Sequence, residues 1–244
     1  MKRYGLIGHP LGHSFSKAYF TEKFEREGLE CEYLNFDIEE ISLIQQLVVD
    51  HPDLKGLNVT IPYKEAILPY LDTLDETAKG VGAVNTVKVL PDGRLKGYNT
   101  DVIGIERTLK NTLTSPVLIL GTGGASKAVQ YVLKQHRMPY YLVSRDPSKG
   151  HFTYESLSPA IIKEYQLIIN ATPVGMAPNI NEAPLIPYEA LTPQHVLFDL
   201  IYNPEETRFL HNGKAKGALT LNGLNMLHAQ AEAAWELWNR EEKQ

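Results

Sequence analysis

A glycine-rich turn between a short apolar run and a helical segment most constrains the fold of this chain. Val117–Leu120 holds four apolar residues, typical of a buried strand, and the turn after it opens a helix expected to reach about His136. Tyr140–Ser144 predicts the next strand. In such a unit, glycines permit the tight turn and let the backbone approach a pyrophosphate on the helix N-terminus. Ser126 replaces the third glycine of the usual pattern, and the expected dinucleotide-binding residues are Gly121, Gly123, Gly124, Ala125 and Ser126.

The residues that end the next predicted strand indicate which dinucleotide this turn would bind. An NAD site usually has an acidic residue there, which holds the ribose 2′-hydroxyl. Here Ser144 and Arg145 occupy that place, and Lys149 follows. A hydroxyl and two cations suit a 2′-phosphate, so the sequence favours NADP. Asp146 could turn inward instead, and the whole segment could be only an exposed polar turn.

The rest of the chain alternates strand-like and helix-like segments, which predicts an α/β protein with two α/β units. The second unit begins near Asp101, and Pro91-Asp92-Gly93 predicts a hairpin. Strands are expected at Tyr4–Gly8, Glu32–Asp37, Leu54–Thr60, Ala83–Leu90, Arg94–Asn99, Leu167–Ala171, Val196–Ile201 and Ala218–Leu221, and helices at Ser14–Arg26, Ile41–Val49, Val102–Asn111 and Leu224–Asn239.

Composition narrows the choice of partners. The chain has 244 residues and a formal net charge of −5, which disfavours nucleic-acid binding. No apolar stretch approaches the roughly 20 residues that span a bilayer, and the N-terminal residues do not resemble a signal peptide, so we expect a cytoplasmic protein without membrane contact. The single cysteine, Cys31, precludes an internal disulfide and favours a core role over a nucleophilic one. The eight histidines lack the spacing of metal ligands, and no metal is expected.

Lys64 is the first candidate for acid–base chemistry. Pro62 suits the first position of a helix, which places Lys64 in its first turn. Cations are disfavoured at that end of a helix, and the same field would lower the pKa of a lysine toward the range in which it acts as a base. Spacing alone favours the simpler interpretation, an exposed lysine that is solvated or paired with Glu65.

Other polar positions also have both a structural and a functional interpretation. Asp101 starts a predicted helix, where the dipole alone would explain an acid, but it could also face Lys64 and hold its charge. Ser14 and Ser16 lie at a loop–helix junction, which suits an N-cap and also offers N–H groups and hydroxyls to a carboxylate. Gln230 lies on the apolar face of the last helix, where a polar side chain needs a partner and could point into a site.

Seven segments, in order from end to end, resemble the shikimate dehydrogenase family. Each is weak alone, but the series is highly specific. The segments are Gly8-His9-Pro10 with His13-Ser14-Phe15-Ser16, Asn58-Val59-Thr60-Ile61-Pro62-Tyr63-Lys64-Glu65, Gly82-Ala83-Val84-Asn85-Thr86, Asn99-Thr100-Asp101, Gly121-Thr122-Gly123-Gly124-Ala125-Ser126, Ile169-Asn170-Ala171-Thr172-Pro173-Val174-Gly175-Met176, and Gly223-Leu224-Asn225-Met226-Leu227-His228-Ala229-Gln230-Ala231.

The resemblance implies a fold and an activity. The fold would be an N-terminal substrate domain with a mostly parallel sheet, residues 1–101 completed by a C-terminal helix at 223–244, and a Rossmann-like NADP domain at 102–222. The activity would be reversible, NADP-dependent hydride transfer between 3-dehydroshikimate and shikimate, in aromatic amino-acid biosynthesis. The protein would be a monomer or a homodimer.

The resemblance also implies residue roles. Lys64 and Asp101 would be the catalytic pair, and Leu200 and Gly223 would lie near the nicotinamide. The residues that would hold shikimate are Ser14, Ser16, Thr60, Asn85, Asp101, Tyr202 and Gln230.

Departures from the family pattern keep two alternatives open. Asn225 replaces a usual glycine, Ser144 a usual asparagine and Asp146 a usual threonine. One alternative is a quinate/shikimate dehydrogenase that uses NAD. The other is a non-catalytic relative that binds shikimate, against which the intact pair of Lys64 and Asp101 argues.

The segment after the second strand of the dinucleotide unit is unusually short. A parallel crossover normally needs a dozen or more residues and usually a helix. About seven residues separate Ser144 from Phe152, and Pro147 and Gly150 both discourage a helix. We therefore predict no helix between Arg145 and Phe152, and a thin, exposed sheet edge there, although residues 152–155 could form a strand by alternation.

Overall fold

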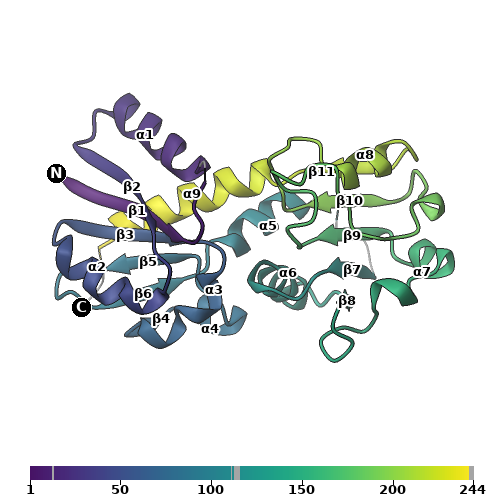
Figure 1. Cartoon of the computed structure of the whole chain (residues 1–244), viewed down its shortest axis with the longest axis horizontal. Helices are drawn as coiled ribbons and strands as arrows, with labels where there is room; N and C mark the ends of the chain where they lie inside the picture. The colour runs from purple at the N-terminus through teal and green to yellow at the C-terminus, as the bar shows by residue number, and fades with distance from the viewer. Residues whose placement is uncertain (13, 111, 113–115, 242–244) are drawn as a thin grey trace. The chain divides into compact units, whose positions relative to one another are not determined.

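The computed structural model describes residues 1–12, 14–110, 112 and 116–241. It divides into two compact units, Met1–Thr100 with Ala231–Gln244, and Asp101–Gln230. His13 and Asn111, which belong to an expected motif and an expected helix, lie outside the described residues. Figure 1 shows the elements of both units by colour along the chain.

The first unit is built on a six-stranded sheet with the order β2-β1-β3-β5-β6-β4. β1 is parallel to both of its neighbours, and β5 is antiparallel to β3 and β6, so the sheet is mostly parallel. The helices of this unit are α1 (Phe15–Glu27), α2 (Ile44–Asp50), α3 (Tyr63–Ala66) and α4 (Glu76–Val81). The strands are β1 (Lys2–Gly8), β2 (Cys31–Asp37), β3 (Leu54–Val59), β4 (Thr73–Leu74), β5 (Thr86–Val89) and β6 (Leu95–Tyr98).

The predicted hairpin is confirmed, and four details of the first unit differ from expectation, among them the unexpected strand β4. β5 and β6 pair across the turn at residues 91–93, where Gly93 takes a φ of 85° that favours glycine. The helix expected from Ile41 starts as a 3₁₀ turn and becomes α-helical only at Ile44. Pro62 is the N-cap of α3 rather than its first residue, and α4 was not expected.

The C-terminal helix α9 (Leu224–Asn239) has the bounds that the sequence predicts, and its last part packs in the core of the first unit. Trp238 is 5% exposed, stacks on Tyr4 with a ring-centroid distance of 4.9 Å, and donates a hydrogen bond of 3.0 Å to the Val87 carbonyl. Gly56 makes room for the indole, because a Cβ on Gly56 would overlap it. Lys23, which is 6% exposed, holds α1 to α9 through the Glu232 carboxylate at 3.0 Å.

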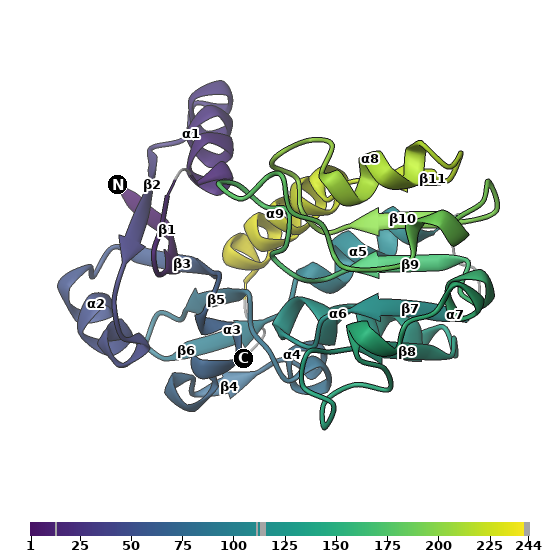
Figure 2. The same cartoon turned by 45° about the vertical axis from the view of Figure 1, so that its right-hand side comes forward.

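The second unit is a five-stranded, fully parallel sheet with the order β11-β10-β9-β7-β8. The chain runs from β7 to β8 in one direction and from β9 through β10 to β11 in the other, so β7 and β9 flank a topological switch point (Figures 1 and 2). The strands are β7 (Val117–Leu120), β8 (Tyr140–Val143), β9 (Leu167–Asn170), β10 (Val196–Asp199) and β11 (Leu219–Leu221). The helices are α5 (Asp101–Leu109), α6 (Gly124–Gln135), α7 (Pro159–Glu164) and α8 (Arg208–Lys214).

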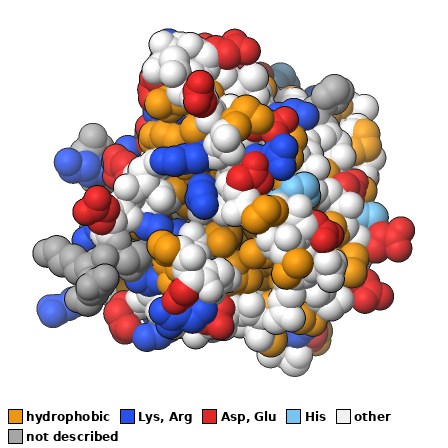
Figure 3. All heavy atoms as spheres, turned by 90° about the vertical axis from the view of Figure 1, so that its left-hand side faces the viewer, with side chains coloured by type: hydrophobic (Ala, Val, Ile, Leu, Met, Phe, Trp, Pro, Cys, Tyr) orange, Lys and Arg blue, Asp and Glu red, His pale blue; other side chains and the backbone are white. Residues whose placement is uncertain are grey.

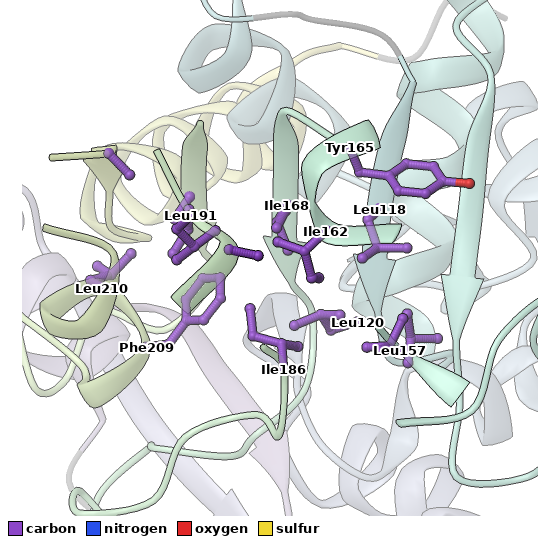
Figure 4. Packing of buried hydrophobic residues seen from close by; sticks show 14 residues of the cluster. Leu118, Leu120, Leu157, Ile162, Tyr165, Ile168, Ile186, Leu191, Phe209 and Leu210 are labelled. Carbon is purple, nitrogen blue, oxygen red and sulfur yellow. The ribbon is translucent and has the colours of Figure 1, made fainter. Parts of the chain in front are cut away.

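One face of this sheet carries a dense apolar core. Figure 4 shows side chains of β7 and β9 meeting side chains of α7 and α8. Leu118, Leu120 and Ile168 are fully buried there, as are Ile162 and Phe209. Continuous burial of short Val/Ile/Leu runs is what a parallel sheet covered by helices requires. The core fixes the strand ends, and with them the loops that follow.

The prediction for the segment after β8 is confirmed. Residues 145–151 contain no helix, and β8 is an edge strand with three of its four residues only partly buried. Residues 152–155 do not form a strand. Phe152 makes a single parallel bridge to Val143, and the chain turns into a 3₁₀ helix at Tyr154. The crossover helix to β9 is the later α7.

One face of the molecule is mixed in charge. Figure 3 shows this face, on which Lys and Arg side chains are interspersed with Asp and Glu. Within the described ranges, no helix has both the length and the apolar composition needed to cross a membrane.

Candidate active site

The sheet topology of the first unit brings several predicted residues to one edge. β1 and β3 are parallel, so Gly8, which ends β1, and Thr60, which follows β3, lie at the same edge. β5 runs the other way, and its first residue, Thr86, pairs with Asn58 and Tyr98. Asn85 therefore lies at this edge too. Thr60 and Ser14 are partly buried, and Ser16 and Asn85 are buried.

A chain of buried hydrogen bonds connects side chains at this edge of the sheet. The Ser16 hydroxyl donates to the Tyr33 phenol. Tyr33 donates to Asn58 Oδ1 at 2.7 Å, and Asn58 Nδ2 lies 3.5 Å from Thr86 Oγ1. Burial raises the pKa of Tyr33, so this phenol stays a neutral donor. Ser14 caps α1, accepting from Lys17 N at 3.2 Å, as its N-cap interpretation predicts.

Asn85 and Thr100 fix each other where β6 ends. The Thr100 N–H donates to Asn85 Oδ1 at 2.7 Å, and Asn85 Nδ2 donates to Thr100 Oγ1 at 3.0 Å. Thr86 Oγ1 lies 3.1 Å from Thr100 Oγ1. Asp101 follows directly and begins α5, with its side chain 4% exposed. These hydrogen bonds hold Thr100 in place after β6.

Lys64 lies in a helix too short for the electrostatic argument made from the sequence. α3 has four residues, so few aligned peptide dipoles act at its start. Lys64 is partly buried, and its carbonyl accepts a hydrogen bond of 2.7 Å from Val84 N. This bond ties α3 to the segment before β5 that carries Asn85.

The glycine turn of the second unit has the predicted form. Gly121 has a φ of 103°, and a Cβ there would come within 2.8 Å of the Thr172 methyl. Gly123 caps α6 with an ordinary φ of −80°, and a Cβ there would meet nothing. The fold therefore requires glycine at position 121 but not at position 123. At position 123, a glycine would allow a ligand to approach the backbone closely. Ser126, fully buried, replaces the packing glycine with a small side chain that accepts from Gln130 at 3.1 Å.

The turn after β8 directs Asp146 away from the strand end. The Asp146 carboxylate accepts from the Ser148 N–H at 2.9 Å and hydroxyl at 2.7 Å, and lies 3.6 Å from Lys149 Nζ. The Ser148 hydrogen bonds hold the pKa of Asp146 below its usual value. Ser144 is buried and accepts from Asp146 N, whereas Arg145 and Lys149 are exposed. The Asp146 carboxylate thus accepts hydrogen bonds within its own turn, and Arg145 and Lys149 are exposed to solvent.

Leu200 and Gly223 are neighbours in the second unit. A Cβ on Gly223 would overlap the Leu200 carbonyl, and Gly223 N donates to the Ile201 carbonyl at 3.0 Å. Leu200 N donates to the Asn170 carbonyl at 3.1 Å. Leu200 thus lies just beyond the carboxyl end of β10, where ligands of open parallel sheets bind. Tyr202 follows two residues later and is partly buried, and Gln230 on α9 is 7% exposed.

A buried carboxylate, Asp199, was missed from the sequence. Its Oδ1 accepts from Asn170 Nδ2 at 3.1 Å and from Ile201 N at 3.0 Å, and its Oδ2 accepts from the Thr207 hydroxyl at 2.6 Å. Desolvation raises the pKa of Asp199 from 3.8 to about 6, against the opposing effect of these donors. The available signal was an acid that ends a buried apolar strand.

We expect Asp199→Asn to stabilise the protein increasingly as the pH rises. The folded pKa lies above the unfolded one, so the stability given by the neutral carboxyl is complete below about pH 4 and is lost as the pH rises through about 6. Between pH 5 and 7.5 the advantage of the variant should grow by about 1 kcal/mol. Urea unfolding of the variant and of wild type at both pH values measures this advantage. An equal difference in unfolding free energy at both pH values would refute the raised pKa of Asp199. Burial raises the pKa of the Tyr188 phenol, and the Asp199 carboxylate raises it further.

Cys31 has the surroundings of an unreactive thiol. Cys31 is partly buried, and desolvation raises its thiol pKa, which disfavours a nucleophile. Residues 1–12, 14–110, 112 and 116–241 contain no group of three or more His, Cys, Asp or Glu placed to hold a metal ion.

Fold and site together define a class of protein. A parallel sheet with a glycine turn at its switch point, in a chain that also holds an α/β unit with a polar sheet edge, is typical of dinucleotide-dependent oxidoreductases. Residues 6–87 match the family model described as the shikimate dehydrogenase substrate binding domain. The chain belongs to the shikimate dehydrogenase family, since relatives of that name also align with nearly all of its length.

Three relatives illustrate the match. The NADP(+) shikimate dehydrogenase of Methanococcus maripaludis (strain C7) is 41% identical over 97% of this chain and 91% of its own length. The enzyme of that name from Desulforamulus reducens is 36% identical over 96% of this chain and 88% of its own. The crystal structure of shikimate 5-dehydrogenase from Thermus thermophilus in complex with NADP(H) and shikimate is 35% identical, with a TM-score of 0.87 over 98% of this chain and 94% of that one.

Proposed function

We propose that this protein is an NADP-dependent shikimate dehydrogenase, which interconverts shikimate and 3-dehydroshikimate in the biosynthesis of aromatic amino acids. The observation that carries the proposal is identity of 41% to an enzyme of that name over 97% of the chain. The structure supports it, because Thr60 and Asn85 lie at the polar edge of the first sheet, and Gly121 and Leu200 follow strands at the carboxyl edge of the second. A cytoplasmic location and a monomeric or dimeric state remain predictions.

The second unit is proposed as the NADP domain, and its residues fit that cofactor. When bound, NADP accepts or supplies a hydride at nicotinamide C4. Gly121, Gly123 and the start of α6 would hold the pyrophosphate, together with Gly124, Ala125 and Ser126. Ser144, Arg145 and Lys149 would hold the 2′-phosphate. Leu200 and Gly223 would lie near the nicotinamide.

The first unit, which includes the last part of α9, is proposed as the substrate domain. Polar side chains hold the hydroxyls and carboxylate of shikimate. Lys64 Nζ takes the proton of the reacting hydroxyl on oxidation and returns it on reduction, while the carbinol hydrogen leaves as a hydride and the carbon becomes a ketone. Asp101 orients Lys64 and holds its charge. The binding residues are Ser14, Ser16, Thr60, Asn85, Asp101, Tyr202 and Gln230.

The direct test of the proposed function follows the reduction of 3-dehydroshikimate by NADPH. We expect one NADPH to be consumed for each shikimate that appears, and chromatography identifies the shikimate. Binding of shikimate without any turnover would replace the proposal by a non-catalytic binding protein.

Arg145→Ala should raise KM for NADP by roughly 10-fold or more and leave KM for NAD within about twofold. The reason is the loss of a charge-assisted contact to a 2′-phosphate that NAD lacks. Steady-state kinetics with both cofactors measures the two values. Arg208→Ala, another exposed arginine of the same unit, is the control and should change neither. An equal effect of Arg145→Ala on both cofactors would remove the 2′-phosphate contact.

A further inference from the structure

One buried hydrogen-bonded cluster joins the loops that follow β9 and β10. We call it the Asp199 cluster, and it consists of Asn170, Thr172, Asp199 and Thr207. Asn170, Asp199 and Thr207 are fully buried. Asn170 ends β9 and Asp199 ends β10, so the cluster lies at the carboxyl edge of the second sheet.

The two carboxylate oxygens of Asp199 have different partners. Oδ1 accepts from Asn170 Nδ2 at 3.1 Å and from Ile201 N at 3.0 Å, and so joins the end of β9 to the segment after β10. Oδ2 accepts from Thr207, at 2.6 Å, which anchors the carboxylate to the N-cap of α8. The bonds that connect the loops therefore converge on a single oxygen.

Asn170 passes this connection on to the loop after β9. Its Oδ1 accepts from the Thr172 hydroxyl at 2.6 Å and from Thr172 N at 3.1 Å. Thr172 Oγ1 in turn accepts from Val174 N at 3.2 Å. Every polar atom of the Asn170 side chain is thereby used, since Nδ2 donates to Asp199. These hydrogen bonds hold the start of the loop after β9.

The cluster reaches the two places where the cofactor is proposed to lie. The Thr172 methyl fills the space beside Gly121, within 2.8 Å of where its Cβ would be. On the other side, Ile201 donates its N–H to Asp199 and accepts from Gly223 through its carbonyl. Asp199 thus connects the glycine turn to the pair of Leu200 and Gly223.

We propose that Asp199 is a positioning residue for NADP, acting through the acceptor Oδ1 that holds the loops after β9 and β10 in their binding arrangement. This inference rests on the proposed function, in which Leu200, in the loop after β10, and Gly223 would lie near the nicotinamide. When the groups that hold a binding site in place are removed, its residues are less precisely positioned. The affinity for the ligand then falls although the protein still folds. The acceptor oxygen, rather than the negative charge, performs the role.

A pair of variants separates the acceptor from the charge. Asp199→Asn retains Oδ1 for Asn170 and Ile201, and its Nδ2 can donate to Thr207. Asp199→Leu has similar size and no acceptor. Titration calorimetry with NADP should give a Kd raised about tenfold or more in Asp199→Leu and restored to within about threefold of wild type in Asp199→Asn. The inference is overturned if folded Asp199→Leu binds NADP as wild type does, or if both variants lose affinity equally.

A control variant separates loss of stability from loss of NADP affinity, and a second pair of variants tests the inference if Asp199→Leu does not fold. Ile162→Ala removes a buried side chain of the same core without touching these loops, and should lower Tm while leaving the Kd for NADP unchanged. Should Asp199→Leu fail to fold, Thr172→Val and Thr172→Ser decide. Val keeps the methyl group and has a second methyl in place of the hydroxyl, and should raise the Kd by about fivefold. Ser keeps the hydroxyl and should bind within about twofold of wild type, and the reverse order would overturn the inference.

Binding and turnover distinguish this inference from the proposed function. Wild-type protein that binds NADP but does not reduce 3-dehydroshikimate would refute the proposed function, and the Kd series would still test the positioning role. Wild-type protein that turns over normally, with no change of Kd in the variants, would refute only the positioning role.

Discussion

Lys64→Ala is expected to lower kcat by about 10²- to 10⁴-fold, the range that a positioned acid–base group contributes. The proton of the reacting hydroxyl then has no proposed acceptor at the first unit's polar edge. The fold should persist, because the bond that Lys64 makes to Val84 comes from its backbone carbonyl. Steady-state oxidation of shikimate at saturating NADP measures kcat, and circular dichroism measures the fold.

Two further variants sharpen this prediction. Lys64→Arg keeps the positive charge but cannot release its proton near neutral pH, so it should be nearly as slow as Lys64→Ala. Lys2→Ala, an exposed lysine at the start of β1, should turn over as wild type does. Recovery of activity in Lys64→Arg would mean that Lys64 serves as a charge, and a kcat of Lys64→Ala within a few-fold of wild type would remove it from the mechanism.

Trp238→Ala is expected to lower the free energy of unfolding of the first unit by about 3–5 kcal/mol, as is usual for a large buried side chain. The indole is 5% exposed, stacks on Tyr4 and occupies the space beside Gly56. Urea unfolding of the full chain, followed by tryptophan fluorescence and circular dichroism, measures the loss.

Matched substitutions separate packing from hydrogen bonding at this position. Trp238→Phe keeps an aromatic ring but loses the donor to the Val87 carbonyl, and should cost less than Trp238→Ala. Val49→Ala, at a site 71% exposed, should change stability by no more than about 0.5 kcal/mol. A loss below about 1 kcal/mol in Trp238→Ala would mean that α9 contributes little to the core of the first unit.

The parts of the fold that could be predicted from the sequence are those with strong local signals. Val117–Leu120 is a strand with the predicted bounds, and α9 spans the predicted Leu224–Asn239, because apolar runs and a long amphipathic pattern are local properties. The absent helix after Arg145 also followed from local chemistry, since proline and glycine occupy a short segment. The glycine turn followed from its position between a strand and a helix.

The rest depends on groups that meet only in three dimensions. α4 and α7 have six residues each and α8 has seven, fewer than the length over which a helical period is recognisable. The shortness of α3, which weakens the field argument for Lys64, is set by the turn into the following 3₁₀ helix. Asp199 and Asn170 are 29 residues apart, so no local pattern could pair them.

The measurement that tests the central claim most directly is oxidation of shikimate and of quinate, each with NADP and with NAD, followed by the absorbance of the reduced nicotinamide. The account predicts turnover of shikimate with NADP, with kcat/KM at least about tenfold above the other three combinations, since a charged 2′-phosphate contact distinguishes the cofactors. Turnover that is equal or faster with NAD would contradict the NADP site built on Ser144 and Arg145. If the protein binds shikimate and NADP but turns over no combination of substrate and cofactor, the claim that it is an enzyme would be contradicted.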